Sequence, residues 1–345
     1  MFRGYRKDPL KHPHTPTYMQ ARRVPTQHAS IVTPVTGVLL LDASSLYFRA
    51  FYGVPERPST PQTPPTNAIR GFLDMISSLI TRYTPEGLVV CWDEDWRPAF
   101  RVNALPSYKA QRVRITTEGI HEEDAPHDLT IQVPIIIQAL RALGIPRIGA
   151  SGYEADDVIA TLAHRWATTP EHPIHVVTGD RDLFQLVDDT KGIDVLYTAR
   201  TGVRAPELVN ETYLHTTYGI RGGRGYLDFA TLRGDPSDGL PGVRGIGEKT
   251  ARTLLEKHGS LAALRAAATD PNSELTATQR TRITNASDYL DAAATVVATA
   301  TDAPIGDVNP ALPRHVADLR LLSDLAARYR LANTFDRLLA VCAIA

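Results

Sequence analysis

The sequence contains little cysteine and lacks long apolar runs. Its 345 residues include only Cys91 and Cys342, so a disulfide framework and a zinc site built from thiolates are both excluded. No segment approaches the roughly 18 apolar residues that a membrane-spanning helix needs. The basic start of the chain is not followed by the apolar stretch of a secretory signal. We therefore expect a soluble protein of a reducing cytoplasm that does not bind membranes.

The net charge is only −1, but basic residues are concentrated in two segments. Residues 1–36 carry six Lys or Arg and one acid, and residues 97–114 carry five Lys or Arg and no acid. Because the first segment lacks hydrophobic periodicity, we interpret it as a flexible arm. Such segments indicate a polyanionic partner. A solvated surface without a partner is the alternative, and for residues 1–36 it is about equally plausible.

Acidic residues follow three short apolar segments that are typical of buried strands. Asp42 follows the apolar residues of 35–44, Asp93 ends the segment 87–93, and Asp180 and Asp182 follow the strand predicted within 174–182. A helical pattern over 68–83 and a further strand over 192–198 complete an alternating order, which predicts a parallel sheet covered by helices on both faces. Since sites in such sheets form beyond the carboxyl ends of the strands, we expect these acids to lie together. Capping of the next helix is the simpler explanation for any one of them.

The stretch "GYEADDVIATLA", residues 152–163, places Glu154, Asp156 and Asp157 in the first turns of a predicted helix. The helix dipole stabilises each charge by only about 0.3–1 kcal/mol, which cannot offset the repulsion of several carboxylates in one cleft. Divalent cations can offset this repulsion. Hard oxygen ligands without a Cys or His cluster favour Mg²⁺ or Mn²⁺. Two such ions about 3.5–4 Å apart are the arrangement used to hydrolyse phosphodiesters.

A glycine-rich segment, residues 240–247, precedes a predicted helix that carries Lys249 and Arg252. Asp235 and Asp238 lie just before it, and its glycines are Gly242, Gly245 and Gly247. Glycine lets backbone amides approach a phosphate closely. No strand precedes the segment, so a dinucleotide site is disfavoured. We interpret it as a helix–hairpin–helix that binds a nucleic-acid backbone, and a plain packing element is the alternative.

Seven motifs in order resemble those of one family. They are "LLLDASSLYFRAFYG", "PTNAIRGF", "CWDEDWRPAFR", "YKAQR", "GYEADDVIATLA", "TGDRDLFQL" and "LRGDPSDGLPGVRGIGEKTA". Together they resemble the 5′ nuclease domain of bacterial DNA polymerase I and its stand-alone relatives, the 5′–3′ exonuclease and flap endonuclease family. The resemblance covers about residues 37–340. It implies an α/β fold with a PIN-like (resolvase-like) parallel-sheet core, a helical arch, and a helix–three-turn–helix module.

The resemblance also implies roles for individual residues. The family's metal-binding acids fall on Asp42, Asp93, Glu154, Asp156, Asp157, Asp180, Asp182, Asp235 and Asp238. The basic residues that contact the scissile phosphate fall on Arg101, Lys109 and Arg112, with Arg49 nearby. The glycine hairpin resembles one that binds K⁺ through backbone carbonyls, which here would be those of Val243 and Ile246. Gly242, Gly245, Gly247, Lys249 and Arg252 complete the expected DNA- and potassium-binding set.

Three regions are expected: a basic arm (1–36), indicated by composition, and, as the resemblance implies, a catalytic core with an arch at about 100–130 (37–206) and a DNA-binding and C-terminal helical region (207–345). Residues 1–36 have no recognised family counterpart, and no polymerase region is expected after residue 345. The arch segment 113–130 has few basic and aromatic residues, so threading of long flaps is left open.

The predicted activity is metal-dependent 5′–3′ exonuclease and 5′-flap endonuclease hydrolysis of DNA in replication and repair. Two divalent ions are expected, with a third as a further option, together with K⁺ at the hairpin. The expected partners are DNA with 5′ ends or flaps and RNA in RNA–DNA hybrids, with the protein acting as a monomer at the bacterial nucleoid. Two alternatives remain: a nuclease-dead protein that binds DNA structures, and a PIN-type ribonuclease.

Overall fold

The computed structural model describes residues 37–57, 64–115 and 121–342. The basic arm predicted for residues 1–36 lies outside these ranges. In the described ranges, no helix combines the length and the apolar character needed to cross a membrane.

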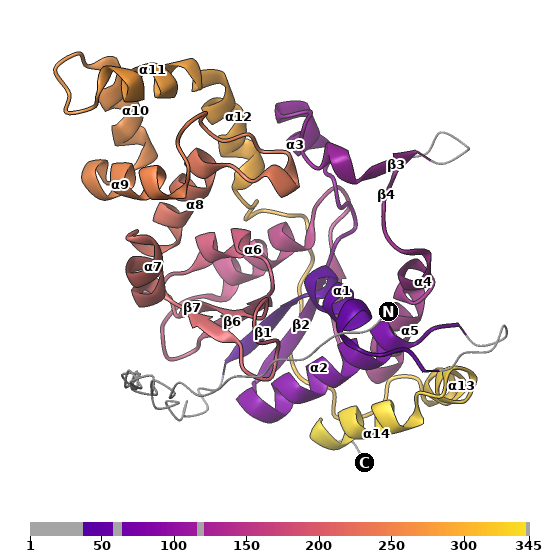
Figure 1. Ribbon diagram of the computed structural model, residues 1–345. Coiled ribbons are helices and arrows are strands. Elements are labelled where there is room, and N and C mark those ends of the chain that lie inside the picture. The colour runs from indigo at the N-terminus through magenta and orange to yellow at the C-terminus, as the bar shows by residue number, and fades with distance from the viewer. Residues whose placement is uncertain (1–36, 58–63, 116–120, 343–345) are drawn as a thin grey trace, which may run out of the picture. The chain divides into compact units, whose positions relative to one another are not determined.

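A six-stranded sheet forms the centre of the fold (Figure 1). Its strands lie in the order β5-β2-β1-β6-β7-β8, and all neighbours are parallel except the last pair. The strands are β1 (Val38–Asp42), β2 (Gly87–Trp92), β5 (Arg147–Gly149), β6 (Ile174–Thr178), β7 (Ile193–Tyr197) and β8 (Glu207–Val209). The predicted strands are thus present, and the predicted fold class is confirmed.

The two faces of the sheet are buried in separate clusters because strand side chains alternate. Leu39 and Leu41 of β1 pack on one face, against α1 (Ala43–Gly53), α2 (Asn67–Tyr83) and α5 (Val133–Leu143). Leu40 packs on the other face, with α6 (Ala155–Trp166) and the helices that follow β8. Both faces of the sheet are buried, which explains the continuous apolar runs in the sequence.

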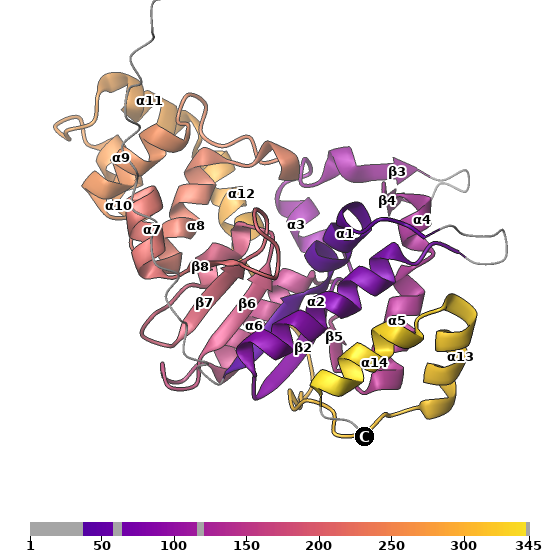
Figure 2. The ribbon, with the colours of Figure 1, turned by 60° about the horizontal axis from the view of Figure 1, so that its bottom comes forward.

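A group of helices follows the last strand, β8, and the segment after these helices is hydrogen-bonded to the sheet. It contains α7 (Glu211–Tyr218), α8 (Gly222–Arg233), α9 (Glu248–His258), α10 (Leu261–Thr269), α11 (Ala277–Asn285) and α12 (Ser287–Val297). The chain then returns to the sheet, where Ala311 bridges to Gly87. Finally, α13 (Leu319–Tyr329) packs on α5, and α14 (Ala332–Val341) packs on α2 (Figures 1 and 2).

The arch differs from the expected helical form. It contains α3 (Ala99–Ala104), the short 3-10 helix η1 (Ala110–Arg112), the hairpin strands β3 (Val113–Ile115) and β4 (His121–Glu123), and α4 (His127–Thr130). The described part therefore combines short helices with an antiparallel hairpin, in which Val113 pairs with Glu123. The β-branched residues at Val113 and Ile115 favour the extended conformation found here.

Candidate active site

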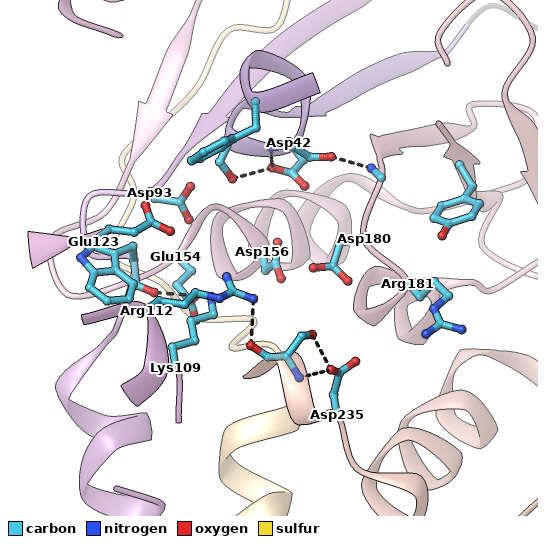
Figure 3. Close-up of a pocket in the computed structure, with 17 residues that line it drawn as sticks. Asp42, Asp93, Lys109, Arg112, Glu123, Glu154, Asp156, Asp180, Arg181 and Asp235 are labelled. Atoms are coloured by element: carbon cyan, nitrogen blue, oxygen red, sulfur yellow. Dashed lines mark hydrogen bonds and ion pairs between the residues drawn. The ribbon is translucent and has the colours of Figure 1, made fainter. Parts of the chain in front are cut away.

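A polar cavity of about 360 Å³ lies beyond the carboxyl ends of the parallel strands (Figure 3). Six of the nine predicted acids line it: Asp42, Asp93, Glu154, Asp156, Asp180 and Asp235. Asp42 ends β1, Asp93 follows β2 and Asp180 follows β6, so the parallel sheet brings together side chains that are up to 138 positions apart in the sequence. The predicted gathering of acids at this edge of the sheet is thus present in the structure.

Asp42 shows that capping and site formation are not exclusive. Its Oδ1 accepts hydrogen bonds from the Ser45 amide (3.2 Å) and the Ser44 hydroxyl (3.1 Å), which caps α1. Its Oδ2 accepts one from the Thr178 hydroxyl at 2.6 Å. Burial and the nearby charge of Asp93 raise the pKa of Asp42 to about 7. A positive charge in the cavity would therefore favour the ionised form of this carboxyl group.

Asp156 lies under the same constraint. Burial raises its pKa well above the usual value, and the charges of Asp42 and Asp180 raise it further. Asp93 accepts a hydrogen bond from the Ala155 amide at 2.9 Å, which holds this acid at the start of α6. These hard oxygen donors suit Mg²⁺ or Mn²⁺. Within the described ranges, no three His, Cys, Asp or Glu side chains already form a metal-binding group, so the donors surround the cavity without forming a closed cage.

Asp157 is not part of the cavity lining, in contrast to the expectation for a metal ligand. The side chain is fully buried. Its Oδ2 accepts from Arg101 Nη1 (2.8 Å) and the Glu154 amide (3.2 Å), and its Oδ1 accepts from Arg101 Nη2 (2.6 Å) and the Ala300 amide (2.8 Å). Four donors thus engage both of its oxygens. In this structure Asp157 therefore has a structural role, because it links Arg101 to the backbone at Ala300.

Arg101 also differs from its predicted role. It is 2% exposed and does not line the cavity, so it is not placed to contact a phosphate there. Besides Asp157, it binds Glu154 and donates to the carbonyls of Val296 (3.1 Å) and Ala298 (3.3 Å). Its guanidinium therefore joins α3, the start of α6 and the segment that leaves α12. We call Arg101, Glu154 and Asp157 the buried ion cluster.

Lys109 and Arg112 do face the cavity (Figure 3). Lys109 forms an ion pair with Glu154, and Arg112 forms one with Asp238. Burial alone would lower the pKa of Lys109, but Glu154, Tyr108 and Asp238 together outweigh burial and hold that pKa well above the usual value. Lys109 is therefore a fixed positive charge at the cavity wall. Its backbone is in the left-handed region, with φ of 48°, which is uncommon outside glycine.

Tyr108 is a site residue to which the sequence pattern assigned no role, although it lies in the quoted motif "YKAQR". The side chain is 5% exposed, and its hydroxyl donates to Glu154 at 2.7 Å from Oε2. Glu154 thus has three partners, Tyr108, Lys109 and Arg101, which orient it. A buried tyrosine hydroxyl needs such a partner. The signal in the sequence was its position beside Lys109.

Three further predicted residues lie around or away from the cavity. Asp238 pairs with Arg112, and Asp182 is half-buried, with its pKa raised by burial and by Asp180. Neither lines the cavity. Arg49 lines a separate groove with Arg82 and donates to the Ala199 carbonyl at 3.1 Å. Its predicted position near the reacting phosphate is therefore not what the structure shows.

The glycine hairpin, residues 240–247, begins close to Asp235. Gly242 and Gly245 have φ of 66° and 80°, so their conformations favour glycine. Gly247, the N-cap of α9, has an ordinary φ of −86°, and the space that a Cβ atom would occupy there is open. The Val243 carbonyl accepts a hydrogen bond from the Ile246 amide at 2.8 Å, and both side chains are buried. Lys249 and Arg252 are exposed on α9, and Arg252 donates to the Thr217 carbonyl.

Comparisons with known proteins match nearly all of the described chain. Residues 37–219 match the model of a 5′-3′ exonuclease N-terminal resolvase-like domain, and residues 223–318 match that of a 5′-3′ exonuclease C-terminal SAM fold. A Streptomyces coelicolor protein named 5′-3′ exonuclease is 52% identical over 87% of this chain and 98% of its own length. A Mycobacterium tuberculosis protein of the same name is 45% identical over 87% of this chain and 96% of its own length.

Two solved structures share the fold at low sequence identity. The bacteriophage T5 D15 protein, co-crystallised with metal ions, aligns with a TM-score of 0.58 at 15% identity and covers 89% of this chain and 99% of its own. The catalytic core of Rad2 in complex with DNA substrate aligns with a TM-score of 0.56 at 16% identity and covers 89% and 93%. At these identities the likeness concerns the fold.

Proposed function

The chain belongs to the 5′-3′ exonuclease family, and we propose that it hydrolyses DNA from 5′ ends and cuts 5′ flaps where they join duplex DNA. The predicted family and the predicted class of enzyme, a structure-dependent 5′ nuclease, are thereby confirmed. The observation that supports the finer proposal is one cavity that combines strand-end carboxylates with Lys109 and Arg112.

The cavity acids are the proposed metal ligands. Asp42, Asp93, Asp156 and Asp180 would hold two divalent ions, Mg²⁺ or Mn²⁺, because burial and mutual repulsion raise the pKa of Asp42 and Asp156, and bound cations would relieve both. When bound, such ions supply an activated water and stabilise the leaving oxygen of the phosphodiester. Asp235 lines the same cavity and is the candidate ligand nearest to the glycine hairpin. Asp182 and Asp238 would act from around the cavity.

Lys109 and Arg112 are the proposed phosphate-binding residues. Each is already paired with an acid, Lys109 with Glu154 and Arg112 with Asp238. These pairs fix the direction of the cations before substrate arrives, which reduces the reorganisation needed as negative charge develops on the phosphoryl oxygens. Arg101 has a different role, because it fixes Glu154 and Asp157 from the buried side.

The glycine hairpin is the proposed contact for the duplex backbone. The left-handed turn at Gly245 lies at the surface, and Lys249 and Arg252 add positive charge on the following helix. We propose that K⁺ binds the carbonyl oxygens of Val243 and Ile246, since each carbonyl oxygen has two lone pairs. Among the backbone hydrogen bonds of the described residues, the Val243 oxygen accepts one and the Ile246 oxygen accepts none, so both oxygens can take a further partner. We further propose a monomer that acts at the nucleoid and accepts RNA in RNA–DNA hybrids.

A cleavage assay tests this function. Duplexes with a recessed 5′ end and with a 5′ flap are incubated with the protein and Mg²⁺ or Mn²⁺, and product sizes are mapped. Asp180→Asn should abolish cleavage of both, whereas Asp302→Asn, which makes the same charge change at an exposed position, should not. Cleavage that persists without divalent ions, or in Asp180→Asn, would refute the assigned site.

A further inference from the structure

Glu123 is an acid in the active-site cavity that no predicted role accounts for. It is the last residue of β4, the returning strand of the arch hairpin, and it lines the cavity with Asp93, Lys109 and Arg112. Figure 3 shows it on the same side as Asp93 and Arg112 and on the opposite side from Asp235. The pairing of Glu123 with Val113 fixes this position, because Val113 directly follows Arg112.

The surroundings of Glu123 keep it close to two cations. Burial and the charge of Asp93 raise its pKa, while Lys109 and Arg112 oppose that rise. The side chain is half-buried. Its carboxylate therefore faces the same cations that are assigned to the phosphate, and it places negative charge where a nucleic-acid strand would add more. Like charges brought together in a partly desolvated cavity repel strongly.

The position of Glu123 relative to the hairpin decides which substrates meet it. In the proposed function the duplex enters from the side of Asp235, which lies shortly before the glycine hairpin in the chain and bridges to its first residue, Leu240. Glu123 lies across the cavity from Asp235 (Figure 3). With the duplex on the side of Asp235, Glu123 would face the part of the strand that continues beyond the cleaved bond. A recessed 5′ end has little or no strand there. A long flap carries a phosphate for each further nucleotide.

We propose that Glu123 is a specificity-determining residue that disfavours long 5′ flaps relative to recessed 5′ ends. The inference rests on the proposed function and deepens it, because it assigns the balance of the two activities to one arch carboxylate. The proposal also gives a physical reason for an arch with few basic residues, because the wall of the cavity formed by the arch would repel the flap strand beyond the cleaved bond.

The test compares kcat/KM on a recessed-end duplex and on a duplex with a flap of some twenty nucleotides. Glu123→Gln should raise the flap-to-recessed ratio roughly 1.5-fold to fivefold, the range expected from one partly solvated charge. Glu123→Lys should raise it further. The matched control is Asp124→Asn, which removes the same charge one residue along, at an exposed side chain outside the cavity, and should leave the ratio unchanged.

Salt provides a readout that a purely structural role would not move. Because screening weakens repulsion, the advantage of Glu123→Gln on the flap should shrink as ionic strength rises. An unchanged ratio, an equal change in Asp124→Asn, or a loss of activity restored only by more Mg²⁺ would overturn the proposal. Absence of cleavage by the unmodified protein on both substrates would instead refute the proposed function.

Discussion

The guanidinium of Arg101 binds the carboxylate of Asp157 through two hydrogen bonds, at 2.8 Å and 2.6 Å, and both side chains are almost fully buried. This pair joins the arch helix α3 to the first turn of α6, and Asp157 continues the connection to the Ala300 amide at 2.8 Å. The pair therefore links three segments that meet behind the active site. Its charges are satisfied by each other and not by substrate.

Arg101→Leu should destabilise the protein by about 3–5 kcal/mol, because it leaves the buried carboxylate of Asp157 without its cation and removes one of the two cations that pair with Glu154. Urea unfolding measures the loss. Arg141→Leu, at an exposed position on α5, is the control and should change stability by less than about 0.5 kcal/mol. The double variant Arg101→Leu/Asp157→Leu should recover part of the loss. Full stability in Arg101→Leu would contradict the assigned role.

The stability of the metal-free protein should fall as pH rises. The pKa of Asp42 is about 7 in the folded state and near its usual 3.8 when unfolded, so between these values the folded state binds the proton more tightly. The contribution of Asp42 to folding stability is therefore greatest below pH 4 and is lost as pH approaches 7. Asp42→Asn should flatten the dependence, as followed by urea midpoints from pH 5 to 8. Asp302→Asn should leave it as it is.

Metal binding should release protons for the same reason. A divalent ion at the cavity favours the charged form of Asp42 and Asp156, whose pKa values are raised without it. Affinity for Mn²⁺ should therefore increase from pH 6 to pH 8. Calorimetry in two buffers that differ in ionisation enthalpy counts the protons released. Identical heats in the two buffers at pH 6.5 would show that these carboxyls are already charged.

Lys109→Ala should slow the chemical step by roughly 10²–10³, the loss typical of one donor to the transition state. Duplex affinity should barely change. Lys249→Ala is the contrasting variant: it removes an exposed cation on α9 and should weaken affinity and its salt dependence while leaving the chemical step intact. Single-turnover rates at saturating protein separate the two. A pure affinity defect in Lys109→Ala would exclude the catalytic assignment.

Two glycines of the hairpin should respond differently to alanine. At Gly242, with φ of 66°, an added Cβ would lie 2.3 Å from the Arg233 carbonyl oxygen, so Gly242→Ala should cost at least about 1–3 kcal/mol of stability. Gly247→Ala meets open space at φ of −86° and should cost less than about 1 kcal/mol, the loss expected from a poorer helix cap. Urea unfolding of the two variants measures the difference.

Duplex binding then tests why Gly247 is glycine. If backbone approaches phosphate there, Gly247→Ala should weaken binding to duplex substrates while the protein stays folded. Cleavage of a short single strand should suffer less. Unchanged duplex binding would mean that the residue serves the fold alone. No positive-φ penalty arises at Gly247, whereas Gly242 and Gly245 carry one.

The sequence was informative where the chemistry follows from local order. Strand-end acids such as Asp42 and Asp180 could be brought together because parallel strands share one edge, whatever the length of chain between them. The sequence could not show that Arg101 is buried, since its partners include carbonyls at Val296 and Ala298, nearly two hundred positions away. The hairpin form of the arch was missed because three-residue strands give little periodic signal.

Helix α14 covers α2, and its Phe335 and Leu338 are buried in the same cluster as Leu39 and Leu41 of β1. During synthesis, β1 is made nearly three hundred residues before Phe335. The α2 side of this cluster therefore remains partly uncovered while most of the chain is being made. A nascent chain halted before α14 should bind a hydrophobic chaperone, and the catalytic region should become protease-resistant only after that helix has emerged.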